Sequence, residues 1–102
     1  MIRALTISEY REIEELANIC MNAYSQTQAA KELKRLSFLS DYLPIGNYAQ
    51  GKIGEVFAYC KVAATNSASY SRRENARSSV QNSLSVLRGF VEKDEKVSRG
   101  EG

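Results

Sequence analysis

Histidine is missing from this chain of 102 residues, and only two cysteines are present. Without histidine, the chain has no His-dependent catalytic triad, no imidazole general base and no imidazole ligand for a metal ion. Two cysteines alone cannot complete a structural zinc site. We therefore expect a protein that is not an enzyme and that uses no cofactor and no metal.

Proline occurs once and glycine six times, so the sequence contains few residues that interrupt regular structure. An architecture of strands and tight turns needs such residues every few positions, and their scarcity favours helices. The sequence also lacks an apolar run of about 18 residues, which a membrane-spanning helix would need. The N-terminus does not show the pattern of a secretory signal. We expect a cytoplasmic protein that does not contact a membrane.

Apolar residues recur at steps of three and four in four segments of the chain, which is the spacing of an amphipathic helix. The pattern predicts helices over residues 7–24, 28–43, 48–65 and 72–92. The stretch 53–64 is among the longest apolar-rich runs, and we expect it to lie in the central helix. Thr6 with Glu9, and Ser71 with Glu74, have the spacing of a capping box. Asn47 is a candidate cap for the third helix.

Four helices of similar length joined by short loops predict an all-α fold, a four-helix bundle-like single domain over residues 1–92. The mixed-charge residues 93–102 are expected to form a disordered tail. The alternative is an irregular fold in which the first two helices form one long bent helix. The residues expected to be buried in the core are Leu36, Phe57, Leu84 and Leu87. Cys20 and Cys60 are expected to be buried free thiols.

The most suggestive surface is on the second helix, on the side opposite Leu33 and Leu36. Two aromatic rings four residues apart follow three cations on that side, and the residues are Lys31, Lys34, Arg35, Phe38 and Tyr42. Such a surface can dock on another protein with the rings as anchors, or it can bind a nucleic-acid backbone and stack on bases. The alternative is that the second helix is covered on both sides and that both rings belong to the core.

Two further features point to contacts with other molecules. Arg72, Arg73 and Arg77 lie at the start of the fourth helix, where they oppose the helix dipole and suggest a compensating anionic group. They could extend the basic patch of the second helix. A stripe of small residues on the third helix suggests a homodimer contact, or else the close approach of a neighbouring helix in the same molecule. Its residues are Gly51, Gly54, Ala58 and Val62.

These features favour a small non-enzymatic protein-interaction module, such as an adaptor, an inhibitor or a regulator. The second hypothesis is a nucleic-acid-binding accessory protein that uses the basic residues of the second and fourth helices. The two differ in salt dependence, because phosphate contacts weaken steeply as salt rises.

Overall fold

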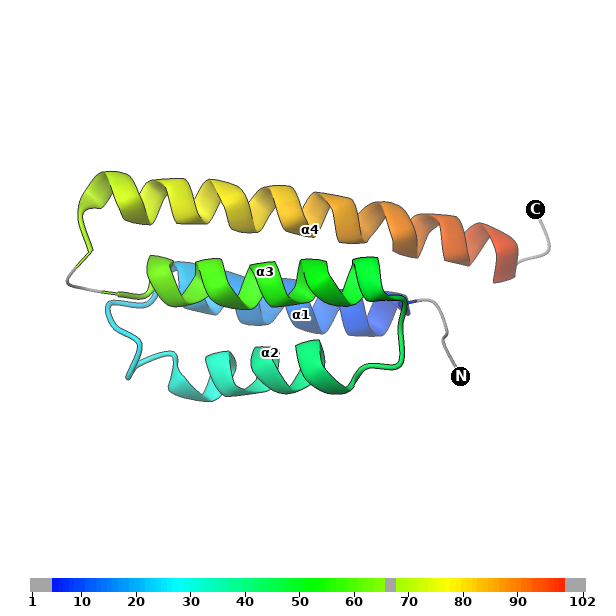
Figure 1. Ribbon diagram of the computed structural model, residues 1–102, viewed down its shortest axis with the longest axis horizontal. Helices are drawn as coiled ribbons and strands as arrows, with labels where there is room; N and C mark the ends of the chain where they lie inside the picture. The colour runs from blue at the N-terminus through cyan, green and yellow to red at the C-terminus, as the bar shows by residue number, and fades with distance from the viewer. Residues whose placement is uncertain (1–4, 66–67, 99–102) are drawn as a thin grey trace.

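The computed structural model describes residues 5–65 and 68–98, with side chains described up to Val91. It contains four helices, which are α1 (Ile7–Met21), α2 (Ala30–Tyr42), α3 (Asn47–Ala63) and α4 (Tyr70–Ser98). They alternate in direction along the chain (Figure 1). The predicted all-α, four-helix fold is confirmed. Because residues 22–29 separate α1 from α2, the alternative of one long bent helix is wrong.

The helices form three layers, with α2 on one side of the α1–α3 pair and α4 on the other (Figure 1). Helix α3 packs against the other three helices, in agreement with the central position expected from its apolar stripe. In the described part of the chain, α2 and α4 do not pack against each other. The surface of α2 and the start of α4 are therefore on opposite sides of the molecule.

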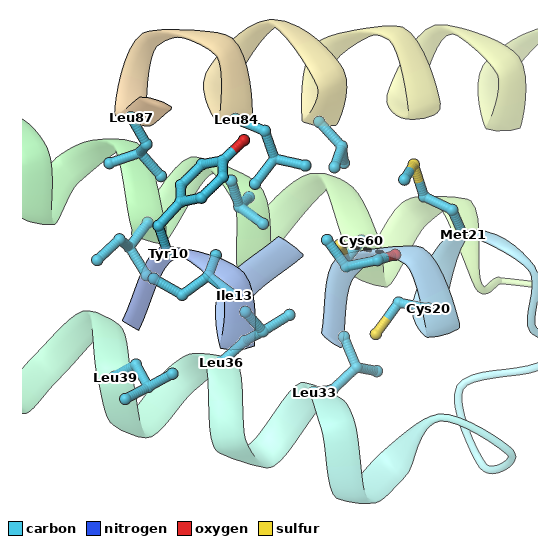
Figure 2. Packing of buried hydrophobic residues seen from close by; sticks show 14 of the residues in the cluster. Tyr10, Ile13, Cys20, Met21, Leu33, Leu36, Leu39, Cys60, Leu84 and Leu87 are labelled. Atoms are coloured by element: carbon cyan, nitrogen blue, oxygen red, sulfur yellow. Dashed lines mark hydrogen bonds between the residues drawn. The ribbon is translucent and has the colours of Figure 1, made fainter. Parts of the chain in front are cut away.

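The core lies between these layers, where side chains from all four helices meet. Figure 2 shows leucines of α2 facing α1 from one side and leucines of α4 facing it from the other. Leu36, Leu84 and Leu87 are buried as predicted. Phe57 was expected among them, but its ring is only partly buried, at the edge of the core. The helical periodicity placed Phe57 on the apolar face of α3, about 40° around the helix from the fully buried Ile53. The ring lies at the edge of that face, where it lines an open hollow between α3 and α2.

The ends of the helices show which capping predictions hold. At α1 the capping box is present: the Glu9 amide donates to Thr6 Oγ1 at 3.2 Å, and the Thr6 amide donates to Glu9 Oε1 at 3.0 Å. Ser71 does not cap α4, because the helix begins one residue earlier, at Tyr70. Ser69 accepts from the Arg72 amide at 3.2 Å instead. Asn47 is the first residue of α3, and Gly46 precedes it without a side-chain cap.

Helix α4 continues beyond the end expected at residue 92. Its backbone is helical up to Ser98, so the first part of the predicted tail extends the helix, and residues 99–102 lie outside the described residues. Throughout the described residues, no helix is both long enough and apolar enough to cross a membrane.

Candidate functional site

The outer face of α2 presents two exposed aromatic rings in contact with each other. Phe38 is 50% exposed and Tyr42 is 70% exposed, and their ring centroids lie 4.8 Å apart. The alternative in which both rings belong to the core is therefore wrong. Their four-residue spacing brings the rings together along the helix. Each ring is held by its neighbour, so less side-chain entropy remains to be lost when a partner covers the pair.

The three cations of this face differ in what they contact. Arg35 binds Glu12 of α1 through two hydrogen bonds, from Nε to Oε2 at 2.7 Å and from Nη2 to Oε1 at 3.3 Å. This ion pair raises the pKa of Arg35, and it ties α2 to α1. The guanidinium also lies 5.4 Å from the centre of the Phe38 ring. Lys31 and Lys34 are exposed and form no ion pair with the described residues.

Phe38 lies on a ridge between two open hollows. The larger one, of about 630 Å³, is a groove between α2 and α3, and it also contacts Lys34, Tyr42, Phe57 and Lys61. The smaller one, of about 460 Å³, lies between α1 and α2. We name the first hollow the α2–α3 groove. Phe38 and Lys34 line both hollows, so these two side chains separate one hollow from the other.

Two residues of the groove, Phe57 and Lys61, were not predicted as part of any site. Phe57 had been assigned to the core, and the Lys61 ammonium lies 5.7 Å from the centre of its ring. The sequence did contain a signal. Lys61 follows Phe57 by four residues and so shares its face, and a face that carries a lysine is seldom fully buried.

The arginines of α4 point to the ends of other helices rather than to the surface of α2. Arg73 Nε donates to the carbonyl oxygen of Ala63 at 3.1 Å, and its Nη2 donates to that of Ala23 at 3.4 Å. Arg77 Nε donates to the carbonyl oxygen of Met21 at 3.1 Å, and its Nη1 binds Glu74. These carbonyls lie at the C-terminal ends of α1 and α3, where unpaired oxygens and the helix dipole attract cations.

The compensating anionic group expected near these arginines is therefore present inside the molecule, as two helix ends and Glu74. Arg72 is exposed and takes no part in these contacts. Because α2 and α4 lie on opposite sides of the α1–α3 layer, the arginines and the α2 surface do not form one continuous basic patch.

The small residues of α3 divide between two environments. Gly54 faces α2, where a Cβ atom would lie 3.2 Å from Ser40 Oγ, so its lack of a side chain serves packing inside the molecule. Gly51 and Ala58 are exposed. These two positions form what we name the exposed strip of α3. Four exposed apolar side chains of α3 and α4 were not singled out by the sequence, and these are Tyr48, Tyr59, Val86 and Phe90. The ring centroids of Tyr48 and Phe90 lie 5.7 Å apart, across α3 and α4.

Both cysteines are free thiols buried in the core, as expected (Figure 2). Contact with the Cys20 thiol and burial raise the pKa of Cys60. The Cys60 Sγ lies 4.0 Å from the carbonyl oxygen of Ala17, an acceptor inside the core. Within residues 5–65 and 68–91, whose side chains are described, no cluster of three or more Cys, Asp or Glu residues is arranged to hold a metal ion.

The chain matches no protein-family model, no curated protein and no solved structure. Its function is therefore inferred from the side chains described above.

Proposed function

We propose that this chain is a non-enzymatic protein-interaction module, an adaptor, inhibitor or regulator of the cytoplasm, that binds another protein through the outer face of α2. The observation that supports the proposal best is the exposed Phe38–Tyr42 pair. It forms an apolar patch beside Lys31 and Lys34, which have no ion-pair partner in the part of the chain that the structure describes. An apolar centre with a charged rim is the usual composition of a protein contact site. Buried free thiols are also common in a reducing compartment.

Aromatic residues at the centre of an interface commonly contribute most of the binding energy. Replacing both Phe38 and Tyr42 with alanine should then weaken partner binding by about 2 kcal/mol or more, which corresponds to roughly thirtyfold. Both side chains are at least half exposed, so the double variant should keep its fold. The matched control is Tyr70→Ala, since Tyr70 is 78% exposed and lies on α4, on the other side of the molecule.

The experiment compares proteins from the source cell that are retained by the immobilised wild type, by Phe38→Ala/Tyr42→Ala and by Tyr70→Ala. A protein that the wild type and the control retain, and that the double variant loses, supports the proposal. Equal retention by all three forms contradicts the α2 site.

Nucleic-acid binding is the alternative function, and it rests on Lys31, Lys34 and the exposed Arg72. Binding through phosphate contacts should fall steeply between about 50 and 200 mM salt, whereas binding anchored by aromatic rings should change little. Retention that is lost over this range, and that nuclease treatment abolishes, would favour the alternative.

A further inference from the structure

The shape of the α2–α3 groove suits one occupant lying along α2. The residues of α2 that line it follow at steps of about one turn, from Ala30 through Lys34 and Phe38 to Tyr42. Twelve residues of helix rise about 18 Å. Phe57 and Lys61 of α3 form the opposite wall. The groove therefore offers a contact about three turns long, bounded on both sides by helices.

The backbone of the occupant must satisfy its own hydrogen bonds in this groove. An extended peptide binds most readily by adding a strand to a sheet edge, and the described residues contain no sheet. A helix pairs its amides and carbonyls internally and presents one apolar face. The groove geometry thus favours a helical occupant with apolar residues at steps of three and four.

The charges along the groove differ from one end to the other. Lys34 of α2 and Lys61 of α3 line it from opposite walls, near the end where α2 begins. Asp41 lines it at the other end, beside Tyr42. An occupant that complements this arrangement carries acidic residues at the lysine end and apolar residues over the rings of Phe38 and Phe57. It carries no acidic residue near Asp41.

We propose that the α2–α3 groove binds an acidic amphipathic helix of another protein, with its carboxylates at Lys34 and Lys61 and its apolar face against Phe38 and Phe57. This inference rests on the proposed function and specifies the partner for the same surface. A second copy of the chain does not fit this description, because its acidic helix α1 uses its apolar face in its own core. A nucleic acid is disfavoured because it carries phosphates along its whole length and would meet Asp41 at the end of the groove opposite the lysines, whereas a helix can carry its carboxylates at the lysine end alone.

The test uses a displayed library of random peptides of about 16 residues, selected on the immobilised full chain. Each enriched peptide is then tested against Phe38→Ala/Tyr42→Ala, Lys34→Glu/Lys61→Glu and Arg11→Glu. Arg11 is exposed on α1 and does not line the groove, so its reversal is the matched control for charge. Binding of synthetic peptides is measured by fluorescence anisotropy, and their helicity by circular dichroism on binding.

The proposal is supported if the enriched peptides are acidic and become helical when bound. Their affinity should fall at least about thirtyfold for Phe38→Ala/Tyr42→Ala and about tenfold for Lys34→Glu/Lys61→Glu. Arg11→Glu should change affinity less than about twofold. Enriched peptides that depend on the rings but are neutral or basic overturn the inference and leave the proposed function standing. If no peptide depends on the rings, or if a single-stranded oligonucleotide displaces the enriched peptides, both proposals fail.

Discussion

Removing Arg73 should destabilise the fold although its side chain lies outside the apolar core. Arg73 joins α4 to the last residue of α3 and to the segment after α1 through two hydrogen bonds to backbone carbonyls. In Arg73→Met the aliphatic stem remains and both donors are lost. A hydrogen bond that involves a charged group contributes about 1.5–3 kcal/mol, and a cation at a helix C-terminus adds about 0.3–1 kcal/mol. Because Arg73 is partly exposed, we expect a loss of about 2 kcal/mol.

Urea unfolding followed by circular dichroism measures this loss of free energy directly. In thermal unfolding, the same loss should lower the melting temperature by about 10 °C. Arg72→Met is the matched control, because Arg72 is exposed and contacts neither helix end, and its free energy of unfolding should change by less than about 0.5 kcal/mol. Equal losses for the two variants would refute the assignment of Arg73 as a cap of two helices.

Four further predictions concern the core, the two thiols and self-association. Ile53→Ala should cost about 2–5 kcal/mol in urea unfolding, because Ile53 is fully buried, and Phe57→Ala should cost clearly less; equal costs would contradict the edge position of Phe57. The raised pKa of Cys60 means that above about pH 8.5 only the unfolded state loses this proton. Stability should therefore fall as pH rises, by up to about 1.4 kcal/mol per unit, and the double variant Cys20→Ala/Cys60→Ala, which removes both contacting thiols, should flatten the slope between about pH 8.5 and 9.5. Native thiols should react with a thiol reagent only as fast as the chain unfolds, and rapid labelling would contradict their burial. We propose that the chain forms a homodimer through the exposed strip of α3, so Ala58→Arg should yield monomers in sedimentation at tens of micromolar; a wild type that is already monomeric there would exclude this dimer.

The sequence predicted the helices well because their apolar periodicity is a local property of the chain. The burial of Leu36, Leu84 and Leu87 followed from it, and so did the exposed side of α2 that carries Phe38. The same periodicity misplaced Phe57, because a stripe shows which face of a helix is apolar but not how much of that face a neighbouring helix covers.

Contacts between helices could not be read from the sequence. Three arginines at the start of one helix suggested an external anion, whereas Arg73 and Arg77 bind helix ends that lie 10 to 56 residues away along the chain. Lys61 became a candidate site residue only when α3 was placed beside α2. The predicted and the observed capping serines are two positions apart, because α4 begins at Tyr70 and so already includes the predicted Ser71.

The position of α2 on one side of the α1–α3 pair has a consequence for how the molecule opens. Helix α2 has 13 residues, no side-chain cap at Ala29 and no contact with α4 among the described residues, whereas α3 is packed on by every other helix. Regions with fewer packed neighbours unfold locally at lower free energy. Amide hydrogens of α2 should therefore exchange with solvent before those of α3. A ligand that covers α2 would slow this exchange most where it lies, so protection of α2 amides would locate the bound partner residue by residue.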